Sequence, residues 1–314
     1  MTEPLVQTEN LSQQFHMRTP GRTDVLHALD NVSLSIACGQ TLGLVGESGC
    51  GKSTLGRCIL RLLRPSSGRI VFAGTDITHM SRRALRPMRR RMQFIPQDPL
   101  ASLNPRQTVT DALGEALTVH RICEKSTVPE RIAALCQSVG LGTDIVNRYP
   151  HELSSGQRQR LLVARALSVE PDFIIADEPT SSLDVSVQAQ VINLLLDLKE
   201  SLRLTYLFIS HDLHVVRIVS DVVAVMYLGR IVEVGSATDL YRSPNHPYTR
   251  VLLEPSQASD DVAADEPPNP LQQPSGCSFH PRCPIAKDIC KNETPALRAL
   301  GGDNVDRQVA CHLA

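Results

Sequence analysis

The chain of 314 residues has no tryptophan, and phenylalanine and tyrosine together bring aromatic residues to only 4% of the sequence. It also lacks a charge excess of either sign, because 32 basic residues nearly balance 33 acidic ones. This balance gives no electrostatic case for a nucleic-acid partner. No apolar run approaches the roughly 20 residues of a membrane-spanning helix. The start, Met1-Thr2-Glu3-Pro4, lacks the basic and apolar regions of a signal peptide. We therefore expect a cytosolic chain whose cysteines stay reduced.

What the chain does contain is typical of a globular protein, with 42% apolar and 21% charged residues and a length that suits about two domains. A basic run between Arg82 and Arg91 is better explained by a solvated helix face than by a polyanion site. Five scattered cysteines are expected to pack as small buried side chains: Cys38, Cys50, Cys58, Cys123 and Cys136.

The clearest motif is a glycine-rich loop with the GxxxxGK[ST] pattern of a phosphate-binding P-loop. A buried strand is predicted before it at residues 41–45, and a helix after it at residues 55–63. Glycines let backbone N–H groups approach phosphate oxygens, and the helix adds the positive end of its dipole. Lys52 is predicted to reach the β- and γ-phosphates and Ser53 to ligate Mg²⁺. A chance match is expected in only about 1% of chains of this length. The predicted nucleotide-binding residues of the loop are Gly46, Ser48, Gly49, Cys50, Gly51, Lys52, Ser53 and Thr54.

The rest of the first 253 residues predicts an α/β fold. Residues 5–45 suit antiparallel strands, and residues 107–148 look helical. A buried strand at residues 173–176 delivers Asp177-Glu178, and another ends before His211. Acidic side chains at the end of a strand beside a P-loop strand are expected to hold Mg²⁺ and the attacking water. We predict a P-loop NTPase core in a domain of residues 1–253, with an antiparallel β subdomain and a helical subdomain at about residues 106–168.

One further segment, Leu153-Ser154-Ser155-Gly156-Gln157, has Ser154 well placed as the N-cap of a helix over residues 157–167. It resembles the signature motif of the ATPase subunits of ATP-binding cassette (ABC) transporters. The resemblance covers about residues 5–253. The P-loop, a glutamine loop, the helical subdomain, the signature, the acidic strand, a Ser-x-Leu-Asp loop and a histidine follow one another in that family's order.

The resemblance implies a role for each matching residue of the ATP site. Gln97 is expected to contact Mg²⁺ and water, and Asp177 to hold Mg²⁺. Glu178 is expected to act as general base on the attacking water. His211 is expected to contact the γ-phosphate, and Lys52 completes the set of predicted catalytic residues.

The resemblance also implies that two cassettes must sandwich ATP, because each signature completes the other subunit's P-loop site. Ser154, Gly156 and Gln157 are then expected to contact the partner's nucleotide, and Asp184 to lie across the dimer interface. Phe15 matches the aromatic residue that stacks on adenine, where the family more often has tyrosine. From its spacing alone, a ring packed in the core is an equal alternative for Phe15.

Residues 94–105 and 244–250 resemble the oligopeptide, dipeptide and nickel importers within this family. That subfamily implies a heterodimer of homologous ATPase subunits beneath two membrane permeases, fed by an extracytoplasmic binding protein. The expected function is ATP-driven import of di- or oligopeptides, performed peripherally at the cytoplasmic face of the inner or plasma membrane. The alternatives are import of nickel or another small solute, a soluble cassette ATPase of translation or DNA repair, and a metal or redox sensor.

Residues 254–275 form a predicted proline-rich linker, and residues 276–314 a Cys-rich C-terminal domain. Its Cys277, Cys283, Cys290 and Cys311 lack the CxxC spacing of common zinc sites. The importer resemblance implies a 4Fe–4S cluster there, with Zn²⁺ as the alternative. Four unliganded thiols are disfavoured because so short and polar a tail is expected to have little core to bury them.

Ser155 departs from the family, because it stands where the signature usually has its first glycine. Its Cβ is expected to tighten or slow the site that it completes, which leaves activity reduced but real. Ser155→Gly is therefore expected to raise the ATP turnover of the assembled dimer. A variant that shows no gain in an ATPase assay would refute this role.

Overall fold

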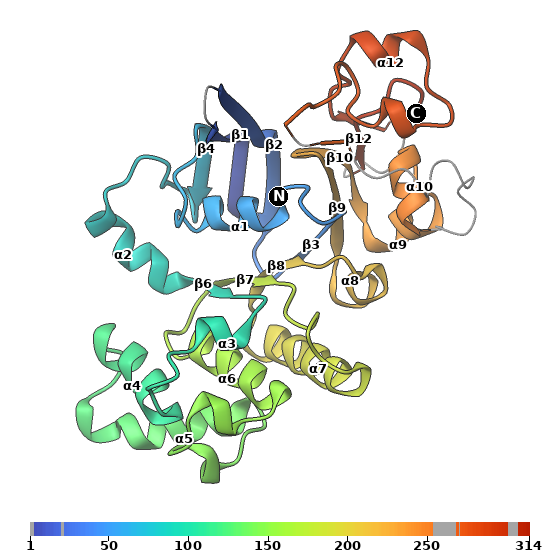
Figure 1. The fold of residues 1–314 in the computed structure, drawn as a ribbon. Helices are drawn as coiled ribbons and strands as arrows, with labels where there is room; N and C mark the ends of the chain where they lie inside the picture. The colour runs from blue at the N-terminus through green and yellow to red at the C-terminus, as the bar shows by residue number, and fades with distance from the viewer. Residues whose placement is uncertain (1–2, 20–21, 254–267, 270, 301–306) are drawn as a thin grey trace. The chain divides into compact units, whose positions relative to one another are not determined.

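The computed structural model describes residues 3–19, 22–253, 268–269, 271–300 and 307–314 (Figure 1). The chain divides into two compact units. Unit 1 combines Met1–His79 with Phe208–Ala314, and unit 2 is the continuous segment Met80–Leu207. Most of the predicted linker, residues 254–267 and 270, lies outside the described residues.

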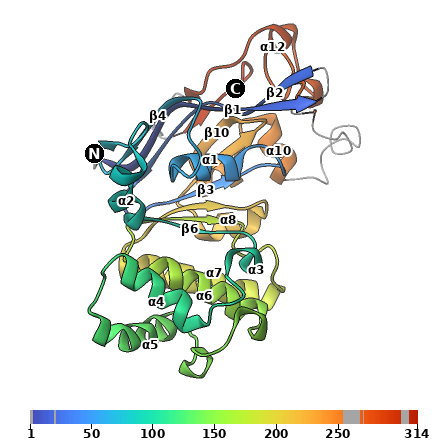
Figure 2. The ribbon, with the colours of Figure 1, turned by 60° about the vertical axis from the view of Figure 1, so that its left-hand side comes forward.

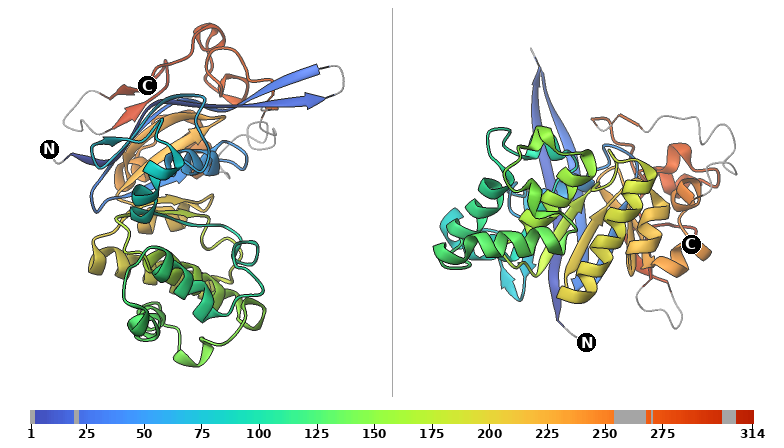
Figure 3. Two further views of the ribbon diagram at one scale, coloured as in Figure 1. Left: turned by 90° about the vertical axis from the view of Figure 1, so that its left-hand side faces the viewer. Right: turned by 90° about the horizontal axis from the view of Figure 1, so that it is seen from below.

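Unit 1 contains an antiparallel sheet with the strand order β2-β1-β4-β5. Strands β1 and β2 form a long hairpin, drawn as a pair of blue arrows in Figure 3. Its apolar side chains alternate with polar ones, and Val6, Leu11 and Leu29 are almost fully buried. The antiparallel arrangement predicted before the P-loop is therefore confirmed. The strands are β1 (Pro4–Thr19), β2 (Arg22–Ala37), β4 (Ser67–Phe72) and β5 (Thr75–Asp76).

A second sheet of unit 1 has the order β11-β12-β10-β9-β3. Strand β3 runs parallel to β9, and every residue of β3 is buried, which fits its continuous apolar sequence. The C-terminal strand β12 pairs with β10 in antiparallel register, so the tail extends this sheet. The strands are β3 (Thr41–Val45), β9 (Val222–Tyr227), β10 (Arg230–Ser236), β11 (Arg298–Ala299) and β12 (Gln308–Val309). Strand β8 (Thr205–Ile209) begins in unit 2 and ends in unit 1.

The helix after the P-loop begins at Lys52 rather than at the expected residue 55. Gly51 is its N-cap with a φ of 111°, and the helix ends at Ile59, shortly before Arg61 takes a φ of 52°. The helices of unit 1 are α1 (Lys52–Ile59), α8 (Leu213–Val219), α9 (Ala237–Arg242), α10 (Pro247–Leu253), the 3₁₀ turn η4 (His280–Arg282) and α12 (Asp288–Asn292).

Unit 2 contains the parallel pair β6 (Met92–Ile95) and β7 (Phe173–Asp177) and a group of helices, several of them green in Figure 2. The helical character predicted for residues 107–148 is confirmed. The helices are α2 (Arg82–Arg91), α3 (Pro99–Ser102), α4 (Val109–Val119), α5 (Val128–Ser138), α6 (Ser155–Leu167) and α7 (Val185–Leu202), with the 3₁₀ turns η1 (Lys125–Thr127), η2 (Thr143–Ile145) and η3 (Pro150–Glu152). Across the described parts of both units, no helix is both long and apolar enough to span the bilayer.

The glutamine loop contains helix α3 directly after Gln97, because the Asp98 carboxylate accepts hydrogen bonds from the backbone N–H groups of Leu100 and Ala101 at 2.8 and 3.2 Å. Two expectations about the cysteines need correction. Cys38 is exposed and Cys123 is only half-buried. Cys38 lies in the turn that follows β2, and Cys123 lies in the connection between α4 and η1. Cys50, Cys58 and Cys136 are buried as expected. The basic run forms α2, in which Leu85 is the one buried residue, so the solvated helix face is confirmed.

Candidate nucleotide-binding site

The P-loop of unit 1 follows β3 and leads into α1. Gly46 and Gly51 have φ angles of 155° and 111°, and both pack against backbone. A Cβ on Gly46 would lie 2.2 Å from the carbonyl oxygen of Met226, and one on Gly51 would lie 2.4 Å from that of Ala28. No side chain fits at either position, so these two glycines are required by the packing. Ser48 and Gly49 lie exposed between them at the tip of the loop.

Lys52 is the first residue of α1, and its side chain is turned into the loop. Its Nζ donates hydrogen bonds to the carbonyl oxygens of Gly46 and Glu47 at 2.7 and 2.9 Å. The residue is only 6% exposed, so these carbonyls and the loop fix the position of the ammonium group. Burial raises the pKa of the Cys50 thiol, whose Sγ lies 3.8 Å from the same Nζ. The loop therefore holds one buried cation at the N-terminus of a helix, where an anion is stabilised.

Two further predicted site residues belong to unit 1. The backbone N–H of Ser210, just after β8, donates to the carbonyl of Leu44 in β3 at 3.2 Å. His211 follows Ser210 directly and is exposed. It therefore lies just beyond the end of β8, the strand beside the P-loop strand. Phe15 is half-buried on β1, opposite Leu26 of β2. Its expected contact with adenine stays a prediction.

Unit 2 carries the predicted acidic residues at the end of β7. Asp177 is 3% exposed, and Glu178 follows it with a φ of 47°, which is uncommon for a residue other than glycine. The amide Nε2 of Gln97 donates to Oε2 of Glu178 at 2.8 Å. The structure thus brings together the residue predicted to contact water and the residue predicted to act as its base. The left-handed backbone at Glu178 had no signal in the sequence.

The signature segment forms the N-terminus of α6, as its Ser154 predicted. The Ser154 hydroxyl accepts from the backbone N–H of Gln157 at 3.2 Å, and the Gln157 side chain accepts from the backbone N–H of Ser154 at 3.0 Å. This capping box orients the exposed Ser154 and Ser155 at the first turn. Gly156 is buried, and a Cβ on it would lie 2.7 Å from Cγ1 of Val187. Asp184 lies exposed at the N-cap of α7.

The tail of unit 1 is better buried than expected. Phe279 is 1% exposed, and Cys290 and Cys311 are 5% and 9% exposed, so the expectation of little core in the tail is wrong. The backbone N–H of Cys277 donates to the carbonyl of Cys290 at 2.8 Å. Burial raises the pKa of the Cys277 and Cys283 thiols, and the neighbouring thiols raise it further. Among the described residues, no group of three or more histidine, cysteine or acidic side chains is placed to hold a metal ion. The predicted 4Fe–4S or Zn²⁺ site is therefore not confirmed.

Local sequence patterns missed the residues that hold Glu47 in the P-loop. Its backbone N–H donates to the hydroxyl of Tyr248 at 2.9 Å, and its carboxylate pairs with Arg282 of the tail. These partners lie 201 and 235 positions further along the chain, and no local pattern could have found them.

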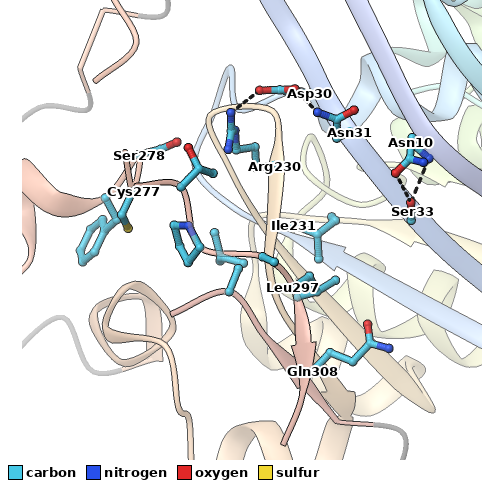
Figure 4. A pocket seen from close by; sticks show the side chains of 16 residues that line it. Asn10, Asp30, Asn31, Ser33, Arg230, Ile231, Cys277, Ser278, Leu297 and Gln308 are labelled. Atoms are coloured by element: carbon cyan, nitrogen blue, oxygen red, sulfur yellow. Dashed lines mark hydrogen bonds and ion pairs between the residues drawn. The ribbon is translucent and has the colours of Figure 1, made fainter. Parts of the chain in front are cut away.

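A separate cavity of unit 1, of about 420 Å³, lies where β1, β2 and β10 approach the tail (Figure 4). An ion pair between Asp30 and Arg230, 2.5 Å apart, marks one side of it, and Asn10 and Ser33 meet at another. The residues that line this cavity are not those of the P-loop, and they include Cys277 and Ser278 of the tail.

Two family models match this chain when it is compared with known proteins. The one described as ABC transporter matches residues 29–181, which contain the P-loop, Gln97, the signature and the acidic pair. The one described as oligopeptide/dipeptide transporter, C-terminal region, matches residues 232–290, which include Tyr248 and Arg282.

Relatives match over nearly the whole chain. A provisionally named peptide import ATP-binding protein of Brucella ovis is 51% identical over 96% of this chain and 96% of its own length. A protein of Brucella abortus with the same description is 49% identical over 99% of this chain and 94% of its own length.

Solved structures match as well. The ATP-binding cassette MJ0796, described as dimeric and bound to ADP and Pi, has a TM-score of 0.66 at 26% identity and covers 74% of this chain and 98% of its own. A cassette of Clostridium perfringens, described as part of an ABC transporter complex, has a TM-score of 0.66 at 27% identity, covering 81% of this chain and 97% of its own.

Glu178→Gln is expected to lower ATP turnover of the assembled dimer by about 10²- to 10⁴-fold, because the amide cannot accept the proton of the attacking water. ATP binding should persist, since the P-loop is unchanged. Lys52→Ala is the contrasting variant and should lose ATP affinity itself. Turnover by steady-state assay and affinity by titration of a fluorescent ATP analogue separate the two effects. A Glu178→Gln turnover within tenfold of the wild type would exclude Glu178 as the base.

Proposed function

This chain belongs to the ATPase subunits of ABC transporters, and we propose that it powers the import of di- or oligopeptides. ATP hydrolysis coupled to transport follows from the family. The proposal of peptides rests on one observation, the match of residues 232–290 to the C-terminal region of oligopeptide and dipeptide transporters. The names of the Brucella relatives, about half identical over almost the whole chain, support it.

The residues proposed for the ATP site are suited to Mg²⁺ and a triphosphate. Ser53, Gln97 and Asp177 offer the oxygen atoms that Mg²⁺ prefers, and Lys52 offers a fixed cation. Bound Mg²⁺ would neutralise charge on the phosphates. The remaining P-loop residues, which are Gly46, Ser48, Gly49, Cys50, Gly51 and Thr54, surround the phosphates with backbone N–H groups and small side chains.

The protein's part in hydrolysis centres on the hydrogen bond between Gln97 and Glu178. The amide donor fixes one carboxylate oxygen of Glu178, and we assign this carboxylate to accept a proton from the attacking water. The left-handed backbone of Glu178, with its φ of 47°, contributes to the direction in which this carboxylate leaves the chain. His211 is assigned to the γ-phosphate, where an imidazole N–H can donate to developing charge.

A second cassette is needed to complete each site in this proposal. Ser154 and Ser155 are exposed at the N-terminus of α6, and Asp184 is exposed at the N-terminus of α7, so these residues can meet a partner. Gly156 keeps the first turn of α6 close to Val187 beneath it. The partner proposed is a second, homologous ATPase subunit in a heterodimer. The dimeric description of a solved cassette supports pairing of this kind.

The proposed partners in the membrane are two permeases, supplied by an extracytoplasmic binding protein. In unit 2, a groove of about 520 Å³ runs along α4 and is lined by Gln107, Thr110, Asp111, Gly114, Glu115 and Thr118, among others. Its glycine and its two carboxylates suit a permease helix that carries basic residues. A permease bound there would hold the chain at the membrane, and the location proposed is peripheral, at the cytoplasmic face of the inner or plasma membrane.

Purification and reconstitution of the transport complex test this function. Two permeases are expected to co-purify with the tagged full-length chain, and peptide-loaded binding protein is expected to stimulate ATP turnover of the reconstituted complex. Binding protein loaded with nickel or another small solute is the matched comparison. Stimulation by that solute alone would overturn the peptide assignment, and stable association with ribosomes or DNA in place of permeases would overturn the transport assignment.

A 4Fe–4S cluster, with Zn²⁺ as the alternative, remains part of the proposal for Cys277, Cys283, Cys290 and Cys311. It is supported by four thiols in one tail, of which Cys290 and Cys311 are buried, and by the neighbouring thiols that raise the pKa of Cys277 and Cys283. Anaerobically purified protein is expected to absorb at about 400 nm and to contain iron. Cys283→Ser should lose the band, and Cys123→Ser, a control far along the sequence, should keep it. Stoichiometric zinc without iron would favour the alternative, and neither metal would exclude both.

A further inference from the structure

The tail reaches the P-loop of unit 1 through a buried ion pair. Nη1 of Arg282 lies 3.0 Å from each carboxylate oxygen of Glu47. The Arg282 side chain is 5% exposed and that of Glu47 is 25% exposed, so water screens the pair weakly. The Arg282 guanidinium also lies over the Phe279 ring at 5.8 Å. A buried charge of this kind is held in one geometry by its partners.

The same tail also supports a second contact that fixes Glu47, a hydrogen bond to its backbone. Phe279 packs against Tyr227 and Tyr248, with ring centroids 5.3 and 5.4 Å apart. Tyr248 is fully buried, and its hydroxyl accepts the hydrogen bond from the Glu47 backbone N–H. The loop residue is thus held by its carboxylate through Arg282 and by its backbone through a tyrosine that the tail covers.

Glu47 affects the phosphate site because it is hydrogen-bonded to Lys52, the residue predicted to contact the phosphates. Its carbonyl oxygen accepts one of the two backbone-directed hydrogen bonds of the Lys52 ammonium. Its carboxylate, within a loop that binds a polyanion, would repel the phosphates if it were unpaired. Arg282 can therefore act on ATP binding in two ways, by fixing the loop and by compensating its one acidic side chain.

We propose that Arg282 is a positioning residue of the ATP site, through which the C-terminal tail sets the geometry and charge of the P-loop. The tail is then part of the nucleotide-binding machinery in addition to any metal that it binds. This inference rests on ATP binding by the P-loop and is independent of which solute is transported.

The test is the affinity of the full-length chain for ATP and for ADP, measured with fluorescent analogues and by competition. Arg282→Ala is expected to weaken ATP binding by about tenfold or more, since it leaves a half-buried carboxylate beside the phosphates. The loss should be smaller for ADP, which carries less charge. Lys291→Ala removes a cation from the same tail, where Lys291 pairs with the exposed Asp288, and should change neither affinity.

Two additional variants separate positioning from a general loss of structure. Adding Glu47→Gln to Arg282→Ala removes the uncompensated charge and is expected to restore much of the affinity. Arg282→Lys keeps the charge and should recover most of the preference for ATP over ADP. If Arg282→Ala is too unstable to purify, Arg282→Gln carries the same expectation with a side chain that better fills the site.

Thermal unfolding of each variant shows whether it is folded, so that a change in ATP affinity can be separated from a loss of structure. A folded Arg282→Ala or Arg282→Gln variant that binds ATP like the wild type would overturn the proposal. An equal loss for ATP and ADP that Glu47→Gln does not relieve would also overturn it, because that pattern indicates disturbed packing alone. Failure of the wild-type chain to bind ATP would instead contradict the proposed site as a whole.

Discussion

The P-loop lies against the backbone of two neighbouring strands so closely that one additional carbon atom would not fit. The carbonyl of Met226 at the end of β9 excludes a Cβ from Gly46, and that of Ala28 in β2 excludes one from Gly51. This constraint fixes both ends of the loop. The start of α1 and the direction of Lys52 follow from it, since Gly51 is the N-cap and Lys52 the first helical residue. The chemistry of the phosphate site therefore depends on backbone packing before any side chain takes part.

Patterns that depend on near neighbours in the sequence predicted their structures well. Strand β3 is buried along its whole length, helices occur within residues 107–148, and Ser154 caps α6. Such features are decided by periodicity and by caps within a few residues, which a single sequence displays. The family order of motifs then predicted the site residues of both units, and these assignments stay predictions.

What the sequence could not predict depends on distant contacts or on backbone strain. Nothing near Glu47 indicated that Tyr248 and Arg282 hold it, and nothing near Glu178 indicated a left-handed backbone. The tail looked too polar to have a core, yet Phe279 enters an aromatic cluster supplied by strand β9 and helix α10. Burial in a short segment depends on the surface that it covers, and that surface was encoded elsewhere in the chain.

The division of the chain into a continuous unit and a discontinuous one has a consequence for its synthesis. Unit 2 occupies one uninterrupted stretch, whereas unit 1 needs residues from both ends of the sequence. Glu47 leaves the ribosome 235 residues before Arg282, a delay of roughly 10–50 s at common rates of translation. During that interval the nascent chain acquires its P-loop, its signature segment and the glutamate proposed as the base, while the loop still lacks its arginine. A message cut short before the tail would thus encode every motif of the family, but not the arginine that holds the first of them.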